Sequence, residues 1–121
     1  FGVADYNFEK LEAYATTVSS DGRFTGYGYF NLYEMPYVDS DAASYGTYII
    51  DILDYRNTSK NTTIGYMQGM NGIVGTVPNK IVFGAGVWDT TVEITTLQFS
   101  TVGTGFTRGS SFSVYGLLGD T

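Results

Sequence analysis

The chain has 121 residues and a mass of 13.2 kDa, which predicts a single domain spanning 1–121. Twelve acidic and six basic residues give a net charge of −6, which argues against nucleic acid or an anionic membrane as the main partner. The chain has no Cys and no His, which excludes thiol nucleophiles, imidazole bases and Cys/His metal sites. We therefore expect a protein that is not an enzyme and needs no cofactor.

The composition favours an all-β fold. Glycine occurs 16 times, proline only twice, and aromatic residues make up 17% of the chain. Aromatic and β-branched residues suit a half-buried pleated surface, and glycines suit tight turns. Charged residues reach only 15%, below the ~25% of an average domain, as expected for a protein in an assembly or in contact with neutral polar ligands. A secreted β domain is the alternative.

The first third of the chain predicts two strands and a loop. Alternating apolar residues indicate a strand at 8–18, although good helix formers at its start leave a helix open. Asp21-Gly22 is typical of a turn, and an aromatic strand follows at 24–33, where Gly26 and Gly28 suit a bulge or a close approach of another segment. The polar stretch 34–46 is predicted to be a loop. The chain begins at Phe1 rather than Met, which indicates a processed chain or the C-terminal part of a longer one.

The middle of the chain predicts three further strands. Residues 48–55 carry apolar side chains on both faces, as in a central strand of a sandwich. A polar turn is expected at 57–61. Strands are then expected at 62–70 and 80–88, around a Gly/Asn/Pro loop at 71–79.

Two last strands complete the prediction. At 92–99 the apolar residues change parity, and a β-bulge near Thr95-Thr96 would place them all on one face. The segment 110–118 has apolar residues on both faces. The sequence thus predicts a jelly-roll-like antiparallel β-sandwich of about seven or eight strands.

The acidic residues do not form a recognisable catalytic or metal site. Asp51 and Asp54 lie three apart on a strand, so they should point to opposite faces. Glu34, Asp39 and Asp41 share one loop and offer oxygens of the type that calcium prefers, but their spacing is not that of an EF-hand. Solvated loop acids are the favoured interpretation, and we assign no catalytic, cofactor-binding or metal residues.

Short Gly- and Asn-containing patterns are interpreted as turns. Asn57-Thr-Ser and Asn61-Thr-Thr match the glycosylation pattern, but such matches arise by chance in a chain rich in these residues. Gly84-Ala-Gly86 and Gly103-Thr-Gly105 lack the rest of a phosphate loop and are expected to be turns or bulges.

The tyrosines provide one positive functional signal. Tyr27, Tyr29 and Tyr33 share one parity and could form an exposed stripe, since Tyr rings stack on sugars and dominate protein interfaces. The favoured alternative is that the stripe faces the core. A carbohydrate-binding module for host surface glycans is therefore the second functional hypothesis.

Three motifs in the C-terminal part resemble a domain of tailed-bacteriophage structural proteins. The segment 48–60, YIIDILDYRNTSK, is similar to the family's I-x-D-Y-x-N-T-x-K pattern. The segment 86–97, GVWDTTVEITTL, resembles G-x-W-x-x-T-x-A-I-T-S-I, and 106–117, FTRGSSFSVYGL, resembles F-x-x-G-S-x-F-S-L-Y-G-I. Residues 1–47 match less clearly, and the family's N-G-D-T loop is absent.

The resemblance implies a structural protein on the exterior of a virion, assembled in the host cytoplasm. Capsid decoration and a tail or fibre module are both compatible with it, and host attachment is one such role. In these motifs Gly109-Ser110 is expected to form a turn, and Trp88 is expected to anchor two sheets to each other. Tyr115-Gly116 is expected where an aromatic ring packs beside a closely approaching backbone.

Self-association is the expected partner relationship. Lysines that would discourage pairing at the strand edges are scarce, and four residues add more apolar surface than one core needs: Ile64, Tyr66, Met67 and Met70. We expect a homotrimer in contact with other virion proteins, the threefold order following from the resemblance alone. A monomer held only by the particle is the alternative. No nucleic acid and no membrane partner is expected.

Overall fold

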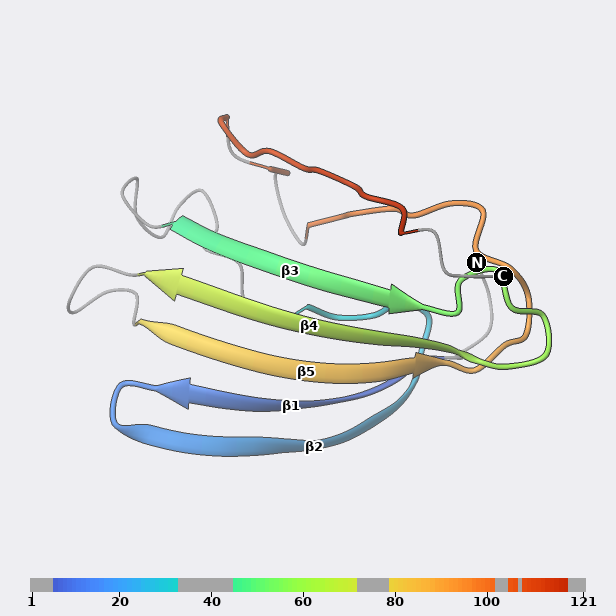
Figure 1. Ribbon diagram of the computed structural model, residues 1–121. Helices are drawn as coiled ribbons and strands as arrows, with labels where there is room; N and C mark the ends of the chain where they lie inside the picture. The colour runs from blue at the N-terminus through green and yellow to red at the C-terminus, as the bar shows by residue number, and fades with distance from the viewer. Residues whose placement is uncertain (1–5, 33–44, 72–78, 102–104, 107, 118–121) are drawn as a thin grey trace.

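The computed structural model describes residues 6–32, 45–71, 79–101, 105–106 and 108–117. Within these ranges five strands form one antiparallel sheet of order β2-β1-β5-β4-β3 (Figure 1). The strands are β1 (Tyr6–Tyr14), β2 (Thr17–Tyr27), β3 (Tyr45–Leu53), β4 (Thr62–Asn71) and β5 (Lys80–Trp88). The all-β prediction is confirmed. Five strands in one layer are fewer than the seven or eight expected, and no described helix is long and apolar enough to span a membrane.

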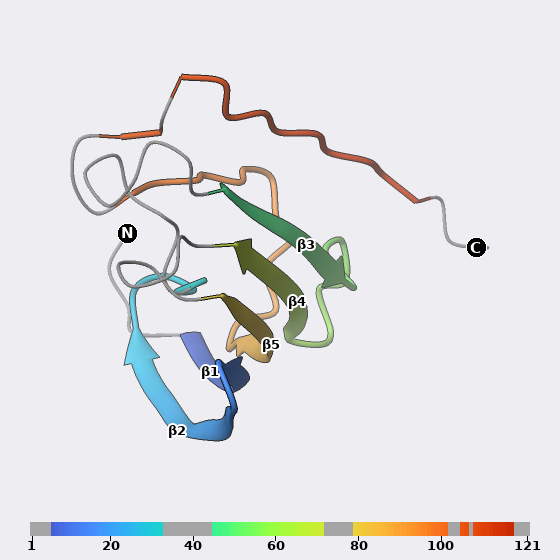
Figure 2. The same cartoon turned by 90° about the vertical axis from the view of Figure 1, so that its left-hand side faces the viewer.

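The sheet consists of a hairpin joined to a meander. β1 and β2 form the hairpin, β3, β4 and β5 form the meander, and β1 pairs with β5 in the middle of the sheet. This order leaves β2 and β3 as the two edges. Figure 2 shows that the sheet is curved and that the chain after β2 turns onto one of its two sides.

The first hairpin turns earlier than the sequence predicts. β1 ends at Tyr14, and the chain reverses at Ala15 and Thr16, where Ala15 has a φ of 50°. The predicted turn at Asp21-Gly22 is wrong: both residues lie within β2. The register shifts from Phe8↔Phe24 to Lys10↔Asp21, so three residues of β2 oppose two of β1 and the chain bulges there.

A second register shift in β2 confirms the predicted bulge at Gly26. The pairs Tyr6↔Tyr27 and Phe8↔Phe24 enclose one extra residue on β2, and Gly26 has a φ of 80°. Glycine adopts this conformation without steric cost, whereas most side chains resist it. β2 ends at Tyr27, six residues before the predicted end of that strand.

β3 is an edge strand and not the central strand that its apolar residues predicted. Its only partner among the described strands is β4, with Ile49 opposite Met67. Ile49 and Leu53 are exposed, while Ile50 and Ile52 on the other face are half-buried. The face of β3 that carries Ile49 and Leu53 is therefore not covered by the described part of the chain.

The next predictions are largely confirmed. β4 and β5 match the strands expected at 62–70 and 80–88. At the predicted polar turn, the amide and hydroxyl of Ser59 both donate to Asn57 Oδ1 at 2.8 Å. This is an Asx turn, in which the side chain substitutes for a backbone acceptor. The predicted loops 34–46 and 71–79 lie almost entirely outside the described residues.

The core lies on one face of the sheet, which we call the inner face. Phe8, Ile64 and Val82 are buried there, and Phe30 beyond β2 packs on Phe8 at a centroid distance of 5.4 Å and on Tyr66 at 5.6 Å. The expectation that Ile64, Tyr66 and Met70 exceed the needs of one core is wrong, because all three are less than 9% exposed. Of the four residues in that group, Met67 alone is exposed.

Two glycines of β5 make room for this core. A Cβ at Gly84 would overlap the ring of Tyr66, and a Cβ at Gly86 would overlap Phe30 and lie 2.6 Å from the backbone oxygen of Asn7. The interpretation of Gly84-Ala-Gly86 as a turn or bulge is therefore wrong. The glycines stand within a regular strand because aromatic rings cross its backbone closely.

The last two predicted strands do not form within the described residues. Residues 92–99 and 110–117 are assigned to no strand. One backbone hydrogen bond, from the Ile94 amide to the Tyr55 carbonyl at 2.8 Å, holds the first segment near the end of β3. A strand needs a continuous ladder, and these segments find none in their own sheet.

Trp88 does not join two sheets. It ends β5, where its ring stacks on Tyr6 of β1 with 6.1 Å between centroids and 10° between planes. Trp88 remains half-buried and anchors neighbouring strands within one sheet.

Candidate functional site

The face opposite the core carries an exposed apolar surface, which we call the outer face. The cross-strand register aligns Leu11, Phe83, Met67 and Ile49 in one row across four strands. The neighbouring row contains Val18, Ala13 and Ile81. Six of these seven side chains are between 41% and 70% exposed, and Ala13 is intermediate. The outer face has the composition of a core but no cover from the described chain.

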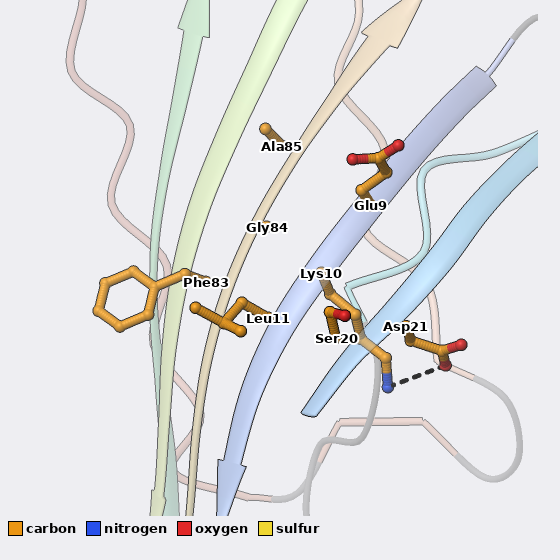
Figure 3. A pocket seen from close by; sticks show the side chains of 8 residues that line it. All are labelled: Glu9, Lys10, Leu11, Ser20, Asp21, Phe83, Gly84 and Ala85. Carbon is orange, nitrogen blue, oxygen red and sulfur yellow. Dashed lines mark ion pairs between the residues drawn. The ribbon is translucent and has the colours of Figure 1, made fainter. Parts of the chain in front are cut away.

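Two open hollows lie over this face. The first is lined mainly by outer-face residues, among them Glu9, Leu11 and Phe83. Figure 3 shows Leu11 and Phe83 pointing to one side of the sheet, while Lys10 points to the other, toward Asp21. The second hollow includes Ala13 and Gly69, whose small size lowers the surface beside Ile81. Both hollows are open to solvent on the exposed side of the sheet.

The second unpartnered apolar feature is residues 110–117, which we call the C-terminal arm. The arm follows a turn at Gly109, where φ is 96°, so the turn predicted at Gly109-Ser110 is confirmed. At its base Phe112 packs against Phe106 at 4.8 Å and Phe99 at 5.6 Å between centroids. Beyond this cluster the arm runs clear of the sheet, past β3 (Figure 2).

Exposure increases along the arm. Phe112 is 52% exposed, Val114 73%, Tyr115 84% and Leu117 88%. A Cβ on Gly116 would meet no atom within 4 Å, so the predicted close backbone approach at Tyr115-Gly116 does not occur among the described residues. The cover that the described residues give to the arm decreases toward Leu117.

Charged side chains gather on the inner face. Glu12 Oε2 lies 2.8 Å from Lys10 Nζ and 3.3 Å from Lys80 Nζ, and Asp21 Oδ2 lies 3.6 Å from Lys10 Nζ. The side chains of both lysines are only 6% exposed. The hydrogen bond from Lys10 holds the pKa of Glu12 below its usual value of 4.5, with Lys80 acting in the same direction against a smaller effect of burial.

This cluster forms an ion network rather than a reactive site. Lys80 Nζ also lies 5.8 Å from the centroid of the Tyr14 ring, within range of a cation–π contact. Burial of ammonium groups requires compensating charge, and the shared carboxylate supplies it. The arrangement fixes the hairpin against β5.

Of the acidic residues considered from the sequence, only Asp51 and Asp54 lie among the described residues. Asp51 is exposed on β3, and Asp54 follows the strand with a φ of 58° while its carbonyl accepts the Asn57 amide at 2.8 Å. Asn61 Nδ2 donates to Asp89 Oδ1 at 2.7 Å, which ties the turn after β3 to the end of β5. Among the described residues no three acidic side chains form a metal-binding group. Glu34, Asp39 and Asp41 lie outside these residues.

The tyrosine stripe is partly exposed. Tyr27 is 37% and Tyr29 58% exposed, and their rings meet edge to face at 5.9 Å. Tyr27 also contacts the buried Phe8 at 5.5 Å. Tyr33 lies outside the described residues. Tyr27 and Tyr29 therefore lie at the border between core and solvent. This position corresponds neither to a stripe that faces the core nor to one that is fully exposed.

Sequence reasoning did not identify the outer face as a surface, and it did not single out Phe83 or Ile81. The alternation of Leu11 with Lys10 and Glu12 would normally place Leu11 in the core. The glycines at 84 and 86 were the available signal for the buried face, because glycines on one face of a strand leave space for aromatic rings to pack there. The aromatic cluster on Gly84 and Gly86 then determines which face is inner.

Comparisons with known proteins add no family assignment: no family model, no curated protein and no solved structure matches the chain.

Proposed function

We propose that the chain is a non-enzymatic structural subunit on the exterior of a tailed-phage virion, serving as capsid decoration or as part of a tail or fibre. The proposal extends to self-association as a homotrimer and to contact with other virion proteins. Its partners are proteins rather than nucleic acid or membrane, in keeping with the net charge of −6.

The observation that carries the assembly role is the exposed apolar outer face. Single exposed apolar residues are common on monomers, but contiguous apolar patches mark interaction sites. Leu11, Phe83, Met67 and Ile49 form a continuous row across the sheet. The virion location is supported by the three motifs resembling tailed-phage structural proteins.

Mass spectrometry of purified phage particles tests the proposal. We expect peptides of this chain in particles produced by the phage that encodes it, with surface labelling of intact particles showing that it is external. Hundreds of copies would indicate capsid decoration, and a few would indicate a tail appendage. Absence of the chain from the particles would refute the virion role.

A carbohydrate-binding function is the second candidate, favoured by the exposed ring of Tyr29. Such rings stack on the apolar faces of sugars. A glycan array tests it with Tyr29→Ala as the variant and Tyr55→Ala as the control, since both side chains are exposed, at 58% and 42%. We expect loss of binding with Tyr29→Ala alone. An array without signal for the unaltered chain would remove this function.

A further inference from the structure

We propose that the C-terminal arm of one copy docks on the outer face of a second copy. The inference deepens the assembly role proposed above by naming the two surfaces that meet. It does not depend on where the assembly is located.

Both surfaces lack cover within the described chain. The outer face exposes Phe83 by 52% and Ile81 by 53%, while Leu117 at the end of the arm is 88% exposed. Among the described residues, no backbone hydrogen bond joins the arm to the sheet. An extended segment with free backbone groups and apolar side chains is suited to docking on another chain.

The two surfaces match in length. Eight extended residues span about 26 Å, and five strands side by side span about 24 Å. The arm is one strand wide, so it covers a strip of the outer face rather than the whole of it. The hollows beside Phe83 and Ile81 provide depressions for the side chains of Val114, Tyr115 and Leu117.

The two surfaces also match in charge. The arm, SSFSVYGL, contains no ionisable group other than Tyr115, and the apolar rows of the outer face contain none. Their contact therefore leaves no charge unpaired, and it should resist salt, because screening weakens only charge interactions.

The exposure gradient favours a second copy over the arm's own sheet. Exposure rises from 52% at Phe112 to 88% at Leu117, and the arm departs from its own sheet beyond β3 (Figure 2). Contact between an arm and a different surface on the neighbour can be reciprocal in a two-fold dimer or can close into a ring, and the trimer proposed above is one such ring.

Disulfide trapping tests the contact directly, because the chain has no cysteine of its own. Leu117→Cys and Phe83→Cys are made in separate chains, one with a mass tag, then mixed and oxidised. We expect a disulfide between the two chains. As a control, Leu117→Cys mixed with Thr58→Cys, which lies in the exposed turn, should give little cross-linked product. The double variant in one chain should give linked multimers. A monomeric intramolecular disulfide in that variant, or no link in the mixture, would overturn the proposal.

Sedimentation provides an independent measurement. The unaltered chain should form species larger than 13.2 kDa at micromolar concentration, and 1 M NaCl should not dissociate them. Leu117→Asp and Phe83→Asp should each weaken association by about tenfold or more, and Thr58→Asp should not. Far-UV circular dichroism checks that each variant folds, and both sites are exposed. A monomer at all concentrations would overturn the proposal even if the chain is found in virions.

Discussion

The ion network on the inner face leads to a specific stability prediction for Glu12→Gln. The substitution keeps the size of the side chain but removes the carboxylate that Lys10 and Lys80 share, at 2.8 and 3.3 Å. Both ammonium groups belong to side chains only 6% exposed, so water replaces the lost charge poorly. We expect the free energy of unfolding to fall.

The size of the effect follows from the burial of the network. Exposed ion pairs contribute about 0.2–1 kcal/mol, whereas breaking a fully buried pair costs about 3–5 kcal/mol. The Glu12 side chain is 18% exposed, which places it between these cases and nearer the buried one. We expect a loss of about 2 kcal/mol at neutral pH.

Urea unfolding at a fixed protein concentration measures this loss, since association would otherwise shift the apparent stability. The pKa of Glu12 is lowered in the folded state, so its contribution is present above the unfolded pKa and disappears as pH falls through the folded pKa. The difference between Glu12→Gln and the unaltered chain should therefore be full above about pH 5 and shrink below about pH 4.

Glu9→Gln is the matched control. Glu9 lies on the same strand but points to the exposed outer face, so its loss should change stability by less than about 0.5 kcal/mol. Equal effects of the two substitutions, or a Glu12→Gln effect that does not change with pH, would refute the role assigned to the shared carboxylate.

Two further substitutions test the local structure, and chemical denaturation reports both. Gly86→Ala should lower stability by about 1–3 kcal/mol because its Cβ would meet Phe30 and the backbone of Asn7. Gly65→Ala is the control and should be nearly neutral, because no atom lies within 4 Å of the added Cβ. A Gly86→Ala variant as stable as the unaltered chain would contradict the close packing. Ala15→Gly should raise stability by up to about 1 kcal/mol because Ala15 has a φ of 50°, and a clear loss would show that this turn is not strained.

The sequence predicted the strands whose residues pair within the sheet. It failed where contacts between distant residues determine the position of a turn or the face that is buried. The apolar pattern located β4 and β5, and Gly26 marked a bulge. The turn of the first hairpin was misplaced because Ala15 occupies a turn position that normally selects Gly or Asn, while Asp21-Gly22 has turn residues but lies in a bulge. Local propensity cannot distinguish a bulge from a turn when both require glycine.

The candidate site was harder to predict because it depends on which face of the sheet is inner. Period two in β1 separates Lys10 and Glu12 from Leu11 and Ala13, and burial of Leu11 is the expected choice. The structure makes the opposite choice. Phe8 shares the lysine face, and Phe30 and Tyr66 pack against the glycines of β5 on that side.

This choice of face links the ion network to the assembly surface. Once the aromatic cluster occupies the inner face, Lys10 and Lys80 are buried with it, and Glu12 must accompany them to balance their charge. The same register places Leu11 and Phe83 on the opposite side, exposed to water. In a lone domain, Leu11 and Phe83 stay exposed to water, which costs hydrophobic free energy. The arrangement is favourable if a second chain covers Leu11 and Phe83, so that the outer face becomes a core shared between copies.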